Sequence, residues 1–106
     1  MDKRKTSLIK QLRVFKKKLM SKHNIDNIIF FGSRAQNKHH KDSDVDLIIV
    51  SKEFKGKSAL KRSPKFYLEW DLNYPVDFLC YTPKEFNKLK KQVSIVSEAL
   101  REGIEV

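Results

Sequence analysis

Apolar residues near the beginning of the chain recur at helical spacing. They follow one another at intervals of three or four residues: Leu8, Leu12, Phe15 and Leu19. This spacing places them on one face of a helix, and basic residues fill the opposite face. We therefore expect an amphipathic helix from about residue 7 to residue 21, with a turn at residues 24–27.

Short apolar runs without helical periodicity occupy residues 28–31, 45–50 and 76–81. Runs of this length that are rich in β-branched and aromatic residues are typical of buried strands. Residues 104–106 are a fourth, very short candidate strand. The basic stretch from residue 51 to residue 62 is expected to form an exposed loop with a short helix.

A helix start signal stands at Ser63 and Pro64, which predict an N-cap and a first turn. This helix should end near residue 72. Its aromatic residues are expected to face inward: Phe66, Tyr67 and Trp70. Stacking of these rings on nucleic-acid bases is the weaker interpretation, because their helical spacing favours the core.

A second start signal combines Thr82, Pro83 and Glu85 in the pattern of a capping box, so a helix should run to about residue 91. Another helix is expected over residues 94–101, ended by Gly103. The order of elements is helix, strand, strand, helix, strand, helix, helix. This order predicts an α/β (α+β) fold in which helices cover a small sheet.

The length of 106 residues predicts a single domain, residues 1–106, with one modest core. The formal charge of +10 favours a polyanionic partner: nucleic acid, nucleotide phosphates or an acidic protein. A lysine-rich, solvated surface without such a partner explains the same charge.

Cys80 is the only cysteine, which excludes an intramolecular disulfide. With neither a signal-peptide pattern nor an apolar run of membrane length, we expect a cytoplasmic protein that does not enter a membrane.

Three aspartates suggest a metal site. Asp44 and Asp46 stand at the entrance of the second strand, so both side chains should share one face while Val45 faces the core. Carboxylates this close repel each other unless a cation lies between them, and Mg²⁺ with phosphate oxygens is suitable. Asp77 joins them if the third strand is a neighbour, and three carboxylates can hold two metal ions. The alternatives are a polar turn at residues 42–44 and an Asp77 that pairs with a lysine at the sheet edge.

Gly32 and Ser33 directly follow the first strand and suggest a phosphate site. Glycine lets the backbone approach a ligand closely, and the Ser33 hydroxyl can donate to a phosphate. If residues 34–36 begin a short helix, its first amides add to an anion site. Arg34 supplies a further positive charge whose direction the sequence leaves open. An ordinary turn also explains the Gly-Ser pair.

This succession of features resembles the minimal nucleotidyltransferases of the DNA polymerase β superfamily over nearly the whole chain. The residues that match at the family's spacing are Gly32, Ser33, Ala35, Ser43, Asp44, Asp46 and Leu47. Asp77 matches the third acidic position, and the ending SEALREGIEV is similar to the family's C-terminus. The resemblance implies the polymerase β-like fold, with a small mixed sheet flanked by helices.

The resemblance also implies an enzyme that moves a nucleoside monophosphate, AMP from ATP, to an acceptor hydroxyl and releases pyrophosphate. The implied phosphate-binding residues are Gly32, Ser33, Arg34 and Ser43. The implied catalytic residues, which also ligate two Mg²⁺ ions, are Asp44, Asp46 and Asp77. Members of this family act as antitoxins beside small helical proteins of the HEPN type, and some adenylylate that partner on a tyrosine. The alternatives are a catalytically idle, nucleotide-binding antitoxin and a basic nucleic-acid-binding domain.

The chain departs from the family at Gln36 and Asn37, where Arg and Gly are usual. Asparagine tolerates left-handed backbone, so Asn37 is expected to keep the turn. The missing Arg removes a positive charge near the loop, which Lys38, Lys41 or Arg34 would have to replace.

Two other patterns are set aside. The segment from Gly56 to Ser58 lacks the first glycine of a phosphate-binding P-loop, because Ser51 stands there. His39 and His40 are adjacent and have no third ligand at a suitable spacing, so a solvated loop is expected rather than a metal site.

Overall fold

A long amphipathic helix, α1 (Lys3–Met20), begins the part of the chain that the computed structural model describes, residues 3–106. It confirms the predicted first helix but starts earlier than residue 7. Its buried residues are Leu8, Ile9, Leu12, Phe15 and Leu19. Neither α1 nor any other helix among residues 3–106 is long and apolar enough to cross a membrane.

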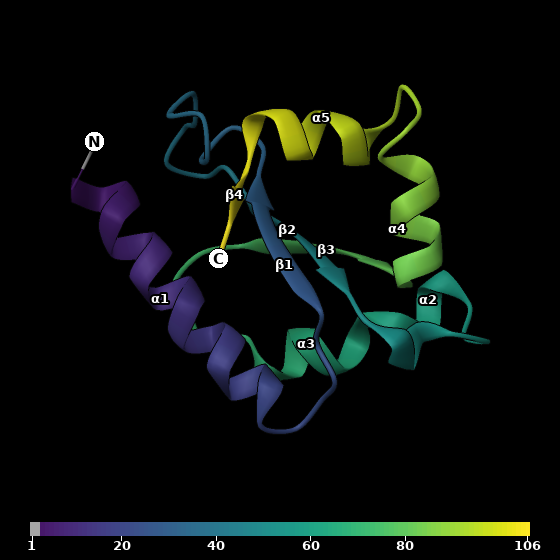
Figure 1. Ribbon diagram of the computed structural model, residues 1–106. Helices are drawn as coiled ribbons and strands as arrows, with labels where there is room; N and C mark the ends of the chain where they lie inside the picture. The colour runs from purple at the N-terminus through teal and green to yellow at the C-terminus, as the bar shows by residue number, and fades with distance from the viewer. Residues whose placement is uncertain (1–2) are drawn as a thin grey trace.

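Four strands form one sheet in the order β3-β2-β1-β4 (Figure 1). The two central strands, β1 (Asn27–Phe31) and β2 (Val45–Val50), are antiparallel. The short strand β4 (Ile104–Glu105) pairs antiparallel with β1, whereas β3 (Val76–Tyr81) runs parallel to β2. The predicted strands and the predicted small mixed sheet are therefore confirmed.

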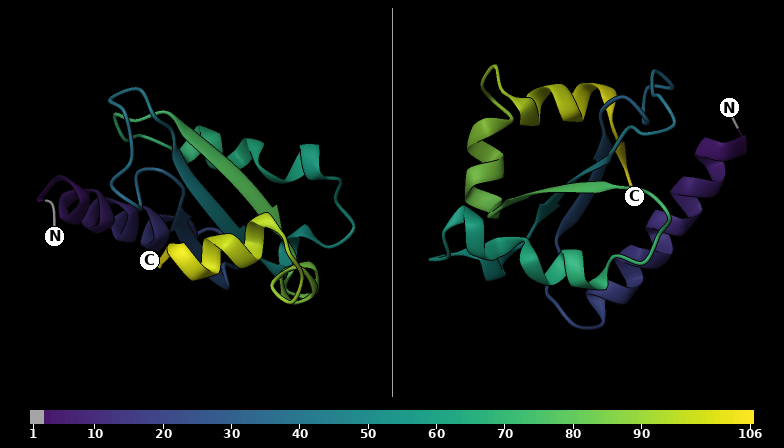
Figure 2. Two further views of the ribbon diagram at one scale, coloured as in Figure 1. Left: turned by 90° about the horizontal axis from the view of Figure 1, so that it is seen from above. Right: turned by 180° about the vertical axis from the view of Figure 1, so that it is seen from behind.

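Helices cover both faces of the sheet. The three that complete the layers are α3 (Pro64–Glu69), α4 (Pro83–Leu89) and α5 (Ile95–Glu102). Seen from above in Figure 2, α3 lies on one side of the sheet and α4 and α5 lie on the other. Along β2, Val45, Leu47 and Ile49 join the core cluster that includes α1 and α3, whereas Ile48 and Val50 join the cluster of α4 and α5. This alternation fixes which strand residues face which layer.

The basic stretch after β2 is less exposed than predicted. It forms a 3₁₀ turn, η1 (Lys52–Phe54), and the expected short helix, α2 (Ala59–Arg62). Phe54 is fully buried, and only 9% of Arg62 is exposed. The Arg62 guanidinium donates to both carboxylate oxygens of Glu85, at 2.6 and 3.1 Å, and to the carbonyl of Cys80 at 3.1 Å. Residues 55–61 are exposed as predicted. The prediction is wrong at Phe54 and Arg62, because an aromatic ring and a guanidinium both find partners inside.

The helix α3 is shorter than predicted. Ser63 occupies the N-cap position and Pro64 lies in the first turn, as predicted, but the side chain of Ser63 makes no capping hydrogen bond. Phe66 is buried as predicted, and Trp70 packs against the core just after the helix. Tyr67 is 42% exposed and does not face inward. Neighbouring helix residues point about 100° apart, and here Tyr67 lies at the border of the buried face, with its ring against Phe78.

The last two helices follow the sequence closely. In α4, the Thr82 hydroxyl accepts from the amide of Glu85, and the Glu85 carboxylate accepts from the amide of Thr82, which confirms the capping box. Gly103 ends α5 with extended backbone. A Cβ at Gly103 would lie 2.4 Å from the Ala99 carbonyl oxygen and 2.8 Å from that of Phe30. Glycine is therefore required where the end of α5 meets β1.

Candidate active site

The strands that carry the predicted acidic residues are neighbours. β2 and β3 run parallel, and Asp46 is paired with Asp77 in their register. Both aspartates belong to the sheet face of α4 and α5, because the adjacent Val45 and Phe78 belong to the opposite core cluster. Asp44 lies immediately before β2, and its charge acts on Asp46. The structure thus places Asp46 and Asp77 side by side and Val45 in the core, as the sequence indicated.

Asp46 shows the electrostatic consequence of this arrangement. Its pKa is raised from 3.8 to about 6, mainly by burial and then by the negative charges of Asp77 and Asp44. A cation among these carboxylates would offset the repulsion and favour ionised Asp46. Among residues 3–106, no three His, Cys, Asp or Glu side chains are gathered tightly enough to enclose an ion. Asp44, Asp46 and Asp77 therefore form an open acidic set rather than a closed cage.

Gly32 lies against this acidic set at the end of β1, where the preceding Phe31 is paired with Asp46. Its φ of +82° is in the left-handed region that favours glycine. A Cβ at Gly32 would lie only 2.2 Å from Oδ2 of Asp46. Glycine is needed here for the backbone and also for the space beside the carboxylate. A cavity of about 230 Å³ adjoins Gly32 on its α5 side.

The loop after Gly32 is a series of turns, so the short helix expected at residues 34–36 does not form. The amide of Lys38 donates to the carbonyl of Ser33 at 2.8 Å. Asn37 has a φ of 59°, which confirms that it supplies the left-handed turn. The Ser43 hydroxyl accepts from the amide of His40 at 2.8 Å. The anion site of a helix N-terminus is therefore absent from residues 33–37, whereas Ser33 itself directly follows Gly32.

Arg34 fastens the two ends of this loop together. Its Nε donates to the carbonyl of Ser43 at 2.7 Å, and Nη2 donates to the carbonyl of Lys41 at 3.0 Å. The guanidinium carbon lies 4.9 Å from the centre of the Tyr74 ring. Only 8% of Arg34 is exposed. Its side chain contacts the α1 side of the molecule, which answers the question of direction that the sequence left open.

Tyr67 contacts the acidic set and was missed as a site residue from the sequence. Its hydroxyl donates to Oδ1 of Asp77 at 3.2 Å and accepts from the amide of Phe78 at 3.2 Å. Burial is the largest cause that raises the pKa of the Tyr67 phenol, so the hydroxyl is protonated and available as a donor. Tyr67 directly follows the buried Phe66 in the helix and therefore points in a different direction, which was the signal in the sequence.

The residues of the weaker sequence patterns lie outside the acidic set. Neither His39 nor His40 belongs to a metal-binding group among residues 3–106. Gly56 has a φ of +78° in an open turn, with nothing within 4 Å of an added Cβ. Burial raises the pKa of the Cys80 thiol to about 12, so this side chain stays protonated and unreactive.

Comparison with known proteins agrees with the resemblance seen in the sequence. The family model described as a nucleotidyltransferase domain matches residues 12–105. A protein of Methanocaldococcus jannaschii, named as a candidate protein adenylyltransferase, is 29% identical over 101 residues, which cover 93% of this chain and 98% of that protein. The candidate protein adenylyltransferase MntA of Haemophilus influenzae is 34% identical over 77 residues, covering 71% of this chain and 68% of MntA.

A solved structure supports the fold. The crystal structure of a candidate nucleotidyltransferase from Sulfolobus solfataricus superposes with a TM-score of 0.68 at 20% identity, covering 95% of this chain and 80% of that one. The family match spans most of the chain and includes the strands that carry Gly32, Asp46 and Asp77. The chain therefore belongs to the nucleotidyltransferase domain family.

Proposed function

We propose that this protein transfers AMP from ATP to a hydroxyl group of another protein and releases pyrophosphate. The observation that carries the proposal is the register of β2 and β3, which pairs Asp46 with Asp77. Asp44 and Gly32 lie next to this pair, so carboxylates and a close-approaching backbone occur together. That combination is suited to a metal-bound triphosphate.

In this proposal the acidic set binds two Mg²⁺ ions together with the triphosphate, whose oxygens complete the coordination. Its donors are carboxylate oxygens, which Mg²⁺ prefers. Burial is the main cause of the raised pKa of Asp46, and the charges of Asp77 and Asp44 raise it further; a cation would offset that second part. In this proposal Asp44 and Asp46 hold the ions, and Asp77 completes the ion nearest the acceptor. Such ions would supply charge neutralisation at the phosphates when bound.

The remaining residues position the two substrates. Gly32 and Ser33 hold the β- and γ-phosphates, while Arg34 and Ser43 keep the loop in the shape that presents them. Asp77 receives the proton of the acceptor hydroxyl as its oxygen attacks the α-phosphorus. Catalysis then depends mainly on positioning and on charge neutralisation.

The acceptor in this proposal is a tyrosine of a small helical partner of the HEPN type, which would make this chain an antitoxin. Support comes from the two relatives, both of which carry the name of protein adenylyltransferase. The chain covers 98% of the length of one of them and 68% of the other. A protein acceptor is therefore favoured over a nucleotide or a nucleic acid.

One observation favours a second candidate function, an idle module that binds nucleotide and partner without transfer. Gln36 replaces the arginine usual in the family, and its side-chain amide is bonded to Glu102 on α5. Position 36 thus contributes no charge to the loop. An idle module would still bind Mg·ATP, so only turnover separates the two functions.

The test is to incubate the purified chain with ATP labelled on its α-phosphate, Mg²⁺ and the protein encoded beside it. We expect label on a tyrosine of that protein, and none when Asp46→Asn replaces the wild type. Binding of Mg·ATP by thermal shift without any transfer would instead establish the idle module. Failure to bind Mg·ATP at all would contradict both candidates.

A further inference from the structure

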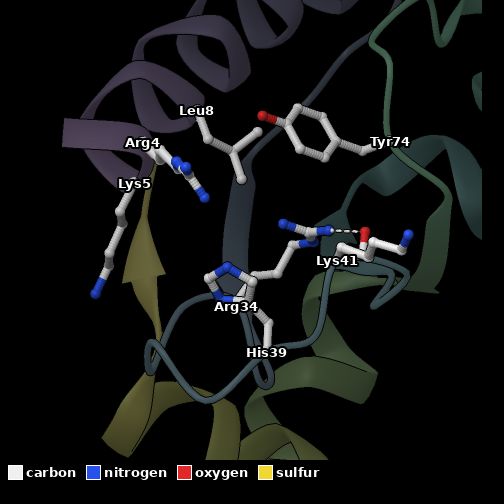
Figure 3. Close-up of a pocket in the computed structure, with 7 residues that line it drawn as sticks. All are labelled: Arg4, Lys5, Leu8, Arg34, His39, Lys41 and Tyr74. Atoms are coloured by element: carbon white, nitrogen blue, oxygen red, sulfur yellow. Dashed lines mark hydrogen bonds between the residues drawn. The ribbon is translucent and has the colours of Figure 1, made fainter. Parts of the chain in front are cut away.

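A basic pocket lies between the first turns of α1 and the loop of residues 33–43. It has a volume of about 360 Å³. The basic side chains that line it come from two segments far apart in sequence: Arg4, Lys5, Arg34 and His39. Leu8 and Tyr74 supply apolar walls, and Lys41 also borders the pocket. Figure 3 shows Arg4, Arg34 and His39 converging from the helix and the loop. No carboxylate is among the described residues that line it.

Arg34 at this pocket is a buried cation without a counter-ion. It is only 8% exposed, and no ion pair joins it to a carboxylate among residues 3–106. A guanidinium carries five N–H donors, and two of those of Arg34 are used on backbone carbonyls. Burying an uncompensated charge is costly, so the site favours an anion that would complete it.

Two more features of the pocket are relevant to its ligand. Nδ1 of His39 is buried and has no hydrogen-bond partner, so a molecule in the pocket can form a hydrogen bond with it. The pocket also lies at the N-terminal end of α1, an 18-residue helix with no acidic residue in its first turn. The partial positive charge of a helix N-terminus adds to that of Arg4 and Lys5. The side chains of Arg4 and Lys5 and the helix end therefore select the same sign of charge.

We propose that this pocket is a second anion site that binds the phosphate group of a nucleotide, separate from the acidic set. The pocket and the acidic set are separate because they lie on opposite faces of the sheet. Asp46 and Asp77 belong to the face of α4 and α5, whereas Leu8 and the rings near Tyr74 belong to the core cluster of α1. The volume exceeds that of one phosphate, and the apolar walls accommodate the rest of the molecule. Arg34 binds the phosphate with the N–H groups that its backbone contacts leave free.

The test follows side-chain NMR signals of Arg34 and His39 in the protein without Mg²⁺ or ATP. Inorganic phosphate, AMP and a short single-stranded oligonucleotide are titrated separately. We expect saturable shifts with AMP and weaker ones with phosphate. Equal affinity for phosphate and AMP would identify free phosphate as the ligand and overturn the nucleotide part of the proposal. Shifts with the oligonucleotide alone would overturn the site altogether.

Two pairs of substitutions distinguish binding in the pocket from nonspecific electrostatic attraction of an anion to a basic protein. Replacing Arg4 and Lys5 by Glu should weaken AMP binding by about tenfold or more, because charged hydrogen bonds are lost. Replacing Lys10 and Arg13 by Glu makes the same charge change on exposed positions of α1 outside the pocket and should have little effect. Asp46→Asn should leave this binding intact. Equal weakening by both pairs, or loss with Asp46→Asn, would overturn the proposal.

Discussion

At the scale of single residues, comparing Gly32 with Gly56 distinguishes the cost of a left-handed backbone from the cost of a steric clash with a neighbouring side chain. Gly32 and Gly56 have nearly the same left-handed φ, +82° and +78°, but only Gly32 has a neighbour, Asp46 Oδ2, where a Cβ would lie. Replacing either by Ala should cost about 1–2 kcal/mol of stability from the backbone. Only Gly32→Ala should also abolish Mg·ATP-dependent transfer, because it displaces the carboxylate.

Urea unfolding and the label-transfer assay measure these two effects. Gly56→Ala is the matched control for strain. If both variants kept full transfer activity, the close approach of Gly32 to Asp46 would have no role in the site.

The raised pKa of Asp46 predicts how stability depends on pH. In the folded chain the Asp46 carboxyl group keeps its proton up to about pH 6, whereas an Asp in the unfolded chain loses its proton near pH 4. Between these values the folded state binds more protons, so this group's contribution to stability is lost as pH rises. The loss amounts to about 1 kcal/mol, since Asp46 is only partly buried.

Urea unfolding of metal-free protein from pH 4 to pH 7 checks whether the free energy of unfolding falls as pH rises. Asp46→Asn should flatten the slope and raise stability at pH 7, while it removes transfer. A wild type and an Asp46→Asn variant with identical pH profiles would mean that Asp46 is not repelled by its neighbours.

At the scale of elements, α3 supports the open edge of β3 through Tyr67. Its hydroxyl links Asp77 to the amide of Phe78. Tyr67→Phe should lower kcat by about tenfold and change KM for ATP little, because a hydrogen bond to a charged group is lost while the phosphate side is untouched. Steady-state kinetics measures kcat and KM separately and so checks this prediction.

Tyr81→Phe is the matched control, since it removes a phenol from the far end of β3, the strand that carries Asp77. It should leave kcat unchanged. A Tyr67→Phe enzyme with wild-type kcat, or a loss confined to KM, would show that Tyr67 does not position Asp77.

The Arg62–Glu85 pair joins α2 to α4 and predicts a loss of stability away from the site. Arg62 is buried and donates to Glu85, Cys80 and Lys57. Arg62→Met should lower the free energy of unfolding by about 2 kcal/mol, less than for a fully buried pair because Glu85 is partly exposed. Denaturant melts measure it, with the exposed Arg13→Met as control. Equal stability of the two variants would show that the pair contributes nothing.

The elements themselves were largely predictable from the sequence. The strands were found because their apolar runs are short and bounded, and the Thr82 capping box has a specific pattern. Errors arose where tertiary contacts outweigh local signals. The burial of Arg62 depends on Glu85, a residue 23 positions later, which no local pattern reveals. The turns at residues 34–37 replaced a helix because Arg34 is held by carbonyls at the far end of its loop.

At the scale of the whole molecule, the sequence placed Asp77 beside Asp46 only on the condition that β2 and β3 are neighbours, which the structure shows, and it left two features hidden. The link from Tyr67 to Asp77 depends on how α3 packs against the edge of β3. The basic pocket depends on α1 lying over the loop that follows β1, residues some 30 positions apart in the chain. The charge of +10 is therefore not spread evenly: acidic residues meet on one face of the sheet, and part of the basic excess lines a pocket on the other.

The central claim is that Asp44, Asp46 and Asp77 form a site for metal-dependent nucleotidyl transfer. Its most direct test compares Mg·ATP affinity and label transfer in the wild type, in Asp77→Asn and in the control Asp71→Asn, an exposed aspartate that pairs with Lys18. We predict that Asp77→Asn binds Mg·ATP within a few-fold of wild type but transfers label at least about a thousandfold more slowly, because it cannot accept the acceptor's proton. Turnover retained in Asp77→Asn would contradict the account.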